Sequence, residues 1–131
     1  MQRRVPHTIT IDTVKRVVRV LVSGIFDAEE APRMTTDARR AAAESGLNIL
    51  YDIRDARAGR LENSDLFWLP RTVPALKDPK APRVRIATLY VGPQCSLIEF
   101  WETAFRNVGL NARGFADEDA AVAWLTPGSG P

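Results

Sequence analysis

The sequence predicts an α/β fold, a single domain on one mostly parallel five-stranded sheet with four helices. Short valine- and isoleucine-rich segments alternate with longer segments of helical periodicity, in the order β-β-α-β-α-β-α-β-α. Strands that alternate with helices form parallel sheets with right-handed crossovers. The length of 131 residues suits one domain. We expect that domain to span residues 1–126, followed by a flexible tail at residues 127–131.

The composition is that of an ordinary globular chain, 45% hydrophobic and 26% charged, with a net charge of +2. No apolar run approaches the roughly 18 residues of a membrane span, and no signal-peptide core follows Met1. Cys95 is the one cysteine, which excludes an internal disulfide and predicts a reducing, cytoplasmic location. The basic residues are interleaved with acidic ones, so we expect no nucleic-acid partner.

The first two strands are predicted to form a hairpin. Residues 7–12, HTITID, alternate apolar and polar side chains with period two, which is typical of an antiparallel edge strand with one buried face. Residues 15–24, KRVVRVLVSG, are nearly continuous in apolar side chains, which predicts a strand inside the sheet with both faces covered.

The first helix is predicted within residues 27–46, DAEEAPRMTTDARRAAAESG. Asp27 and Glu30 have the spacing of a capping box, and Gly46 suits the C-terminal end. Proline is tolerated only in the first turn of a helix, so either the regular helix begins near Pro32 or its first turn is distorted. Residues 47–53, LNILYDI, follow as the third strand, and residues 54–63 as a loop.

The second half of the chain continues the alternation of strands and helices. Residues 64–77 have apolar side chains at helical spacing, but Pro70 and Pro74 interrupt them, so this second helix should be short, kinked or broken. Four further elements complete the order. They are a fourth strand at residues 83–92, a third helix at 93–109 closed by Gly109, a last strand at 110–115, and a last helix at 116–125 capped by Asp117.

Three stretches of the chain carry a resemblance to a known family. NILYDIRD is predicted to be a buried third strand that ends in an acidic residue. RVRIATLY with FWETAFRNVG is predicted to form the fourth strand and its aromatic helix, and RGFADEDAAVAWL to form the closing strand and helix. Together they resemble STAS-like domains, the family of bacterial anti-sigma-factor antagonists, and especially its stand-alone bacterial members of unassigned function. The resemblance implies a right-handed β-α superhelix with its strands in sequential order.

In regulatory members of that family, a serine or threonine at the start of the second helix is phosphorylated by a partner kinase. Ser64 stands at about that place, between Asn63 and Asp65, but no Asp-Ser-Ser-Gly stretch surrounds it. The simpler interpretation of Ser64 is a helix N-cap, and phosphorylation is the alternative.

Charged residues follow the apolar part of the third strand: Asp52, Arg54, Asp55 and Arg57. Ligands of open α/β sheets gather at the carboxyl ends of strands, so a carboxylate here could be a general base and Arg54 could bind an anion. No histidine, nucleophile or metal-ligand set accompanies them in the sequence. Ion pairs that shape the loop are therefore the first interpretation, and a docking surface for another protein is the second.

Six aromatic residues of the helices cannot all occupy one narrow stripe: Phe67, Trp68, Phe100, Trp101, Phe105 and Trp124. Trp68 falls off the apolar stripe of the second helix, and Phe100 falls off that of the third. They predict a second buried surface, which would be a dimer contact, a partner contact or an apolar ligand cleft. The alternative is that they wrap around helix edges into the same core.

Two further residues could carry chemistry alone. Cys95 begins the third helix, where the helix dipole can lower a thiol pKa, although packing is the commoner role. His7 is the only histidine and lies near the amino terminus, so we expect it to be solvated. Neither residue predicts a metal site.

Three functions are consistent with the sequence. The first is a non-enzymatic, cytoplasmic interaction or regulatory domain that forms a homodimer through its second and third helices and the loop after the third strand. The second is a carrier of a lipid or other apolar small molecule in a cleft under the second helix. The third is an enzyme that acts on a small anionic substrate through Asp52, Asp55 and Arg54. We expect no cofactor.

Overall fold

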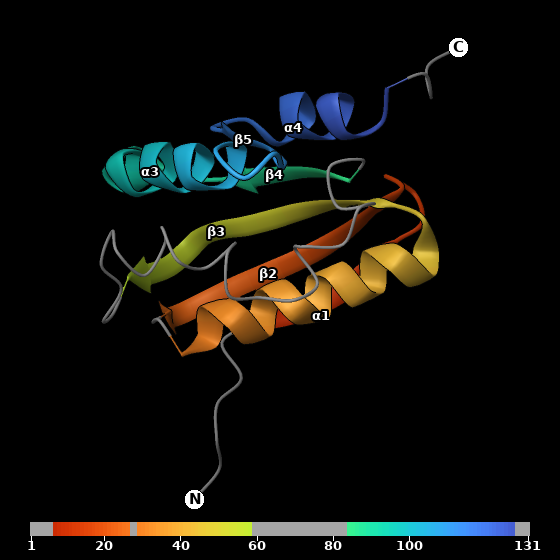
Figure 1. The fold of residues 1–131 in the computed structure, drawn as a ribbon, viewed down its shortest axis with the longest axis horizontal. Helices are drawn as coiled ribbons and strands as arrows, with labels where there is room; N and C mark the ends of the chain where they lie inside the picture. The colour runs from red at the N-terminus through yellow and green to blue at the C-terminus, as the bar shows by residue number, and fades with distance from the viewer. Residues whose placement is uncertain (1–6, 27–28, 59–83, 128–131) are drawn as a thin grey trace, which may run out of the picture.

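A computed structural model of the chain describes residues 7–26, 29–58 and 84–127 (Figure 1). These residues form a five-stranded sheet in the order β1-β2-β3-β4-β5. β1 is antiparallel to β2 and the other neighbours are parallel, so the predicted sheet and its antiparallel edge are confirmed. The strands are β1 (His7–Asp12), β2 (Val17–Phe26), β3 (Asn48–Ala58), β4 (Arg85–Leu89) and β5 (Asn111–Phe115).

Three α-helices lie within the described residues: α1 (Glu30–Ser45), α3 (Cys95–Arg106) and α4 (Glu118–Leu125). A 3-10 turn, η3 (Gly92–Gln94), leads directly into α3. The second helix predicted at residues 64–77 lies outside the described residues, and so do Ser64, Phe67, Trp68 and most of the predicted tail.

The sheet divides the core into two parts because successive side chains of a strand point to opposite faces. On one face, α1 and α3 cover Val18, Val20 and Tyr51, and contribute Met34 and Trp101 to the same cluster. On the other face, α4 packs over β3, β4 and β5. Its cluster consists of Val17, Leu50, Ala87, Leu89, Ala121 and Leu125.

Two helix ends differ from the prediction: the start of α1, and the end of α3, which stops at Arg106 and not at Gly109. The N-cap of α1 is Glu29, not the predicted Asp27, and the helix begins at Glu30. Pro32 then falls in the first turn, where its missing N–H costs no helical hydrogen bond. At the other end Gly46 has a left-handed φ of 75° and donates its N–H to Ala42, as its position predicts.

β2 lies inside the sheet as predicted, and both of its faces are covered at its start, but the cover on the α4 face is lost farther along the strand. Val17, Val18, Val20 and Val22 are fully buried, whereas Leu21 is 42% exposed. α4 is short and packs over β3, β4 and β5, so it does not reach across this part of β2.

β3 is longer than predicted and runs through Ala58, so Arg54, Asp55 and Arg57 belong to a strand and not to a loop. Within the described residues, β1 pairs with β2 as far as Val22, and β4 pairs with β3 as far as Asp52. Beyond a bulge, Ser23–Phe26 and Asp55–Ala58 pair only with each other within the described sheet. We call this two-stranded extension, which projects past β4 in Figure 1, the ribbon.

α3 approaches β5 closely at Gly114. The N–H of Gly114 donates to Glu102 Oε1 at 2.7 Å. A Cβ atom at Gly114 would stand 2.4 Å from Ile98 Cγ2 and 2.8 Å from Glu102 Oε1. The absence of a side chain at this position therefore sets the distance between the helix and the strand.

We expect Gly114→Ala to lower the free energy of unfolding by about 1–3 kcal/mol, because α3 must move away from β5 to admit the methyl group. Urea denaturation of the variant and the wild-type chain measures the change. Gly92→Ala is the matched control, since nothing lies within 4 Å of its added Cβ. Equal losses in the two variants would contradict this account of the α3–β5 contact.

Candidate functional site

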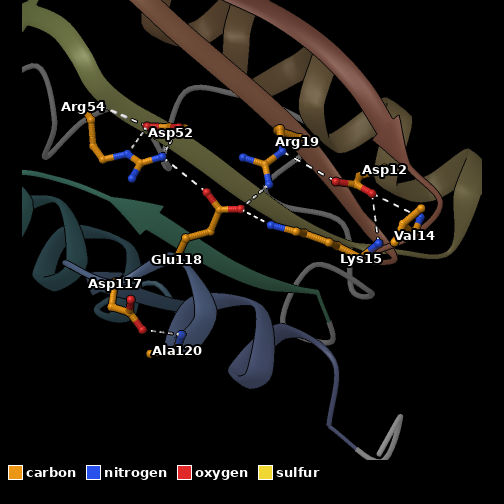
Figure 2. Close-up of polar contacts among 9 residues, drawn as sticks. All are labelled: Asp12, Val14, Lys15, Arg19, Asp52, Arg54, Asp117, Glu118 and Ala120. Carbon is orange, nitrogen blue, oxygen red and sulfur yellow. Dashed lines mark hydrogen bonds and ion pairs between the residues drawn. The ribbon is translucent and has the colours of Figure 1, made fainter.

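Charged side chains from four elements meet on the α4 face of the sheet (Figure 2). Glu118, the first residue of α4, is at the centre, and its carboxylate contacts Arg19 of β2 at 2.7 Å and Arg54 of β3 at 3.3 Å. It also accepts a hydrogen bond from Lys15 in the β1–β2 turn. We call the connected set the ion network: Asp12, Lys15, Arg19, Asp52, Arg54 and Glu118.

Asp52 and Arg54 form a bidentate pair because residues two apart on a strand point to the same face. Arg54 Nε donates to Asp52 Oδ1 at 2.9 Å, and its Nη2 donates to Oδ2 at 2.8 Å. Burial alone would raise the pKa of the Asp52 carboxyl, but the hydrogen bonds and charge of Arg54 outweigh it and hold that pKa below its usual value. A carboxylate held in this way is a poor proton acceptor near neutral pH.

Glu118 is positioned by the start of α4. Asp117 caps the helix by accepting the N–H of Ala120 at 2.9 Å, as its position in the sequence predicts. The hydrogen bonds of Arg19 and Lys15 to the Glu118 carboxylate lower its pKa from 4.5 to about 2. The ion network therefore joins the β1–β2 turn, β2, β3 and α4 through ionised groups at neutral pH.

The four charged residues singled out in the sequence do not form one cluster. Asp52 and Arg54 belong to the ion network, and Asp52 is only 7% exposed. Asp55 and Arg57 are exposed on the ribbon, paired in register with Ser23 and Ile25 of β2. The pairing of Asp52 with Arg54 agrees with the ion-pair interpretation, although the pair lies in a strand.

The opposite face of the sheet holds an apolar cavity of about 340 Å³ between α1 and α3. Its floor is β3, and Met34 of α1 and Trp101 of α3 line its sides. Arg57 is the one charged side chain among its described lining residues. These residues are Met34, Tyr51, Ile53, Ala56, Arg57, Thr88, Pro93, Gln94, Leu97, Ile98 and Trp101.

Gln94 fixes the end of β3 beside this cavity. Its Nε2 donates to the carbonyl oxygens of Ile53 at 2.7 Å and Ala56 at 3.0 Å, and its Oε1 accepts the N–H of Val91. One amide thus satisfies carbonyl groups of β3 beyond the point where β4 stops pairing. The sequence offers no signal for this role, because Gln94 is far from β3 along the chain.

One expectation for an isolated residue is wrong, and one alternative is not supported. His7 was expected to be solvated, but β1 directs it toward α1, and only 8% of its side chain is exposed. Its Nε2 lies 3.2 Å from Asp37, and its Nδ1 lies 3.6 Å from Glu30. Cys95 does begin α3, but partial burial and the neighbouring Glu99 raise its thiol pKa instead of lowering it.

Phe100 is half-buried and packs against the α1–α3 core, as expected if off-stripe aromatic residues wrap around helix edges. Among the described residues, no three histidine, cysteine, aspartate or glutamate side chains are grouped to hold a metal ion. None of the described helices is long and apolar enough to cross a membrane.

No family model and no curated protein matches this sequence. Several solved structures resemble the chain, and these include the following two. An uncharacterized protein of the DUF3478 family with a SpoIIAA-like fold, from Shewanella loihica PV-4, has 18% identity, a TM-score of 0.55 and 92% coverage of both chains. The anti-sigma factor antagonist SpoIIAA in its unphosphorylated form has 14% identity and a TM-score of 0.51, with 91% of this chain and 96% of that chain covered.

The chain therefore has the SpoIIAA-like fold, and the resemblance to STAS-like domains noted in the sequence is confirmed for the fold. The sequential strand order of the sheet agrees with the β-α superhelix that the resemblance implies.

We expect Glu118→Gln to lower the free energy of unfolding by about 1 kcal/mol at pH 7, because three cations lose their shared carboxylate. The pKa of Glu118 falls from 4.5 to about 2 on folding, so its contribution is complete above pH 4.5 and is lost as the pH falls toward 2. Urea denaturation between pH 7 and pH 2 should give a shallower acid dependence for the variant.

Asp119→Asn is the matched control, since Asp119 is an exposed acid in the same helical turn and no ion pair of the described residues involves it. Identical pH profiles for the two variants would contradict a stabilising role for the ion network.

Proposed function

We propose that this protein is a non-enzymatic regulatory domain that binds other proteins, and that it associates with a second copy of itself. The ribbon is the observation that carries the proposal. It presents a strand edge that nothing in the described chain covers, together with an exposed apolar side chain, and both are features of surfaces that bind protein.

The free edge of the ribbon is on the β2 side. Gln94 already occupies two carbonyl groups of β3, at Ile53 and Ala56. β1 stops pairing with β2 at Val22, so the edge of Ser23–Phe26 is open within the described residues. Ile25 on this strand is 68% exposed. A strand of a second copy could extend the sheet here and cover Ile25.

The exposed charges of the ribbon favour recognition by another protein. Asp55 and Arg57 are exposed and of opposite sign, and no ion pair between them occurs among the described contacts. Charges of this kind set orientation and partner choice at an interface more than they set affinity. They are among the residues that we proposed from the sequence as a docking site, together with Ser64, Phe67, Trp68 and Phe100.

The geometry of Asp52 favours binding over the enzymatic alternative. Asp52 and Arg54 are bound to each other on the α4 face, whereas the cavity is on the α1–α3 face. An enzyme that used Asp52, Asp55 and Arg54 would need these groups around one concave site. The SpoIIAA-like fold adds support for a regulatory role, since SpoIIAA is an anti-sigma factor antagonist.

Ile25→Asp is expected to weaken self-association by at least about tenfold, because it places a charge in the apolar part of the proposed interface. Sedimentation equilibrium over a range of protein concentrations measures the dimer dissociation constant. Val14→Asp is the matched control: Val14 is 89% exposed but lies in the β1–β2 turn, at the other end of β2. A wild-type chain that stays monomeric, or equal effects of the two variants, would rule out self-association through the ribbon.

A second candidate function is the carriage of an apolar small molecule, and the cavity between α1 and α3 favours it. Its volume of about 340 Å³ falls within the range of small-molecule sites, and most of its described lining is apolar. The cleft expected from the sequence lay under the second helix, which is outside the described residues; the described lining of this cavity comes from α1, β3, β4, η3 and α3.

If the protein is a carrier, native mass spectrometry of gently purified protein should show an added mass that disappears after denaturation and refolding. Such a ligand would be lost because unfolding removes the cavity that holds it. An unliganded mass in protein taken directly from cells, together with no uptake of an added apolar probe, would contradict carriage.

A further inference from the structure

The ribbon is joined to the rest of the sheet through an irregular stretch of β2 and β3. Leu21 pairs with Asp52 before it. The next pair is Ser23 with Asp55, so β3 has one residue more than β2 between the two pairs. An extra residue in one strand interrupts the ladder and bends that strand. Gly24 follows with a φ of 74°, in the left-handed region that favours glycine. The orientation of the ribbon therefore depends on contacts outside the regular ladder.

Gln94 makes such a contact from the wall of the cavity. Its Nε2 donates to the carbonyl oxygen of Ile53, within the bulge, at 2.7 Å and to that of Ala56, in the ribbon, at 3.0 Å. Gln94 belongs to η3, which leads directly into α3, and its side chain lines the cavity. The ribbon is thus attached to the cavity wall at the point where its strand bends.

The ribbon also forms part of that wall. Ala56 and Arg57 line the cavity, together with Ile53 at the bulge. In the β2–β3 ladder, Ala56 pairs with Gly24, and Arg57 pairs with Ile25. Adjacent strands lie about 4.8 Å apart, so the lining residues are direct neighbours of the strand edge that the described chain leaves open. The cavity and the proposed self-association surface therefore share the ribbon.

A molecule in the cavity would contact the helices and the ribbon at once. Met34 of α1 and Leu97 of α3 line the cavity from the helices, and Ala56 lines it from the ribbon. Apolar contact on both sides favours a ribbon packed against the molecule over a ribbon tilted away at the bulge, because it removes apolar surface from water. A ligand shifts such an equilibrium by its difference in affinity for the two arrangements.

We propose that an apolar small molecule in the cavity strengthens self-association through the ribbon. Packing against the molecule holds Ala56 and Arg57 in place, and the ladder passes this restraint to Gly24 and Ile25. A second copy then has less motion of the ribbon to remove, so it binds more tightly. Linkage requires that self-association raise the affinity for the molecule by the same factor. This inference rests on both functions proposed above and adds the regulation that joins them.

Sedimentation equilibrium with and without decan-1-ol tests the proposal, after calorimetric titration has established the concentration that saturates the protein. We expect saturating decan-1-ol to lower the dimer dissociation constant at least about fivefold. In the titration, decan-1-ol should bind more tightly at protein concentrations above that constant than below it. Ile25→Asp, which weakens the dimer, should remove this dependence on protein concentration and still bind decan-1-ol.

Ala56→Leu replaces the molecule with a side chain of the ribbon itself. The cavity of about 340 Å³ has room for the added group, which would occupy the space between the ribbon and the helices. We expect this variant to bind decan-1-ol at least about tenfold more weakly and to dimerise without it as tightly as the saturated wild-type chain. Ala123→Leu is the matched control, because Ala123 is exposed on α4, on the other face of the sheet. It should behave as the wild-type chain in both measurements.

The outcomes separate this inference from the functions on which it rests. Binding of decan-1-ol without a change in the dimer dissociation constant would overturn the linkage and leave both functions in place. A chain that binds no decan-1-ol would overturn the linkage together with the carrier function. A chain that stays monomeric with decan-1-ol bound would overturn the linkage together with self-association. A tighter dimer with decan-1-ol, and in Ala56→Leu without it, is the result that we expect.

Discussion

The alternation of side chains along β3 is the constraint on which the rest of the structure depends. Tyr51 and Asp52 are neighbours in sequence, yet the pleat sends Tyr51 to the α1–α3 face and Asp52 to the α4 face. One strand therefore contributes to an apolar cavity and to the ion network without mixing them. A shift of β3 by one residue would bury Asp52 among apolar side chains and expose Tyr51, so the two faces together fix its register.

The two faces differ in what they can do. On the α4 face, ionised groups satisfy one another and hold α4 to β2 and β3, so their charges serve the fold. On the α1–α3 face, mostly apolar side chains of the described residues line a cavity. Beyond the bulge, β2 and β3 continue as the ribbon. Its exposed Ile25 and its strand edge, which the described residues leave open, form a third surface suited to protein contact.

Much of the fold could be predicted because its signals are local. Period-two alternation marked β1, the valine run placed β2 inside the sheet, and Gly46 and Asp117 marked helix ends that the structure confirms. The site was less predictable. The polar composition of residues 54–58 indicated a loop, but pairing with β2 keeps this segment in a strand. The cover of β2 was also overestimated, because its apolar sequence does not say that α4 packs over β3, β4 and β5 and leaves Leu21 exposed.

By itself the sequence determined the α/β class, the hairpin of β1 and β2 and the cap of α4, since each depends on residues that are close along the chain. The sequential order of the strands was expected only from the resemblance to STAS-like domains. Only the tertiary structure decided that Glu118 joins Lys15, Arg19 and Arg54, that Gln94 holds the end of β3, and that Trp101 and Tyr51 share a cavity. These contacts join residues far apart in sequence, and crossover geometry and helix packing set their distances. No local pattern of residues encodes those distances.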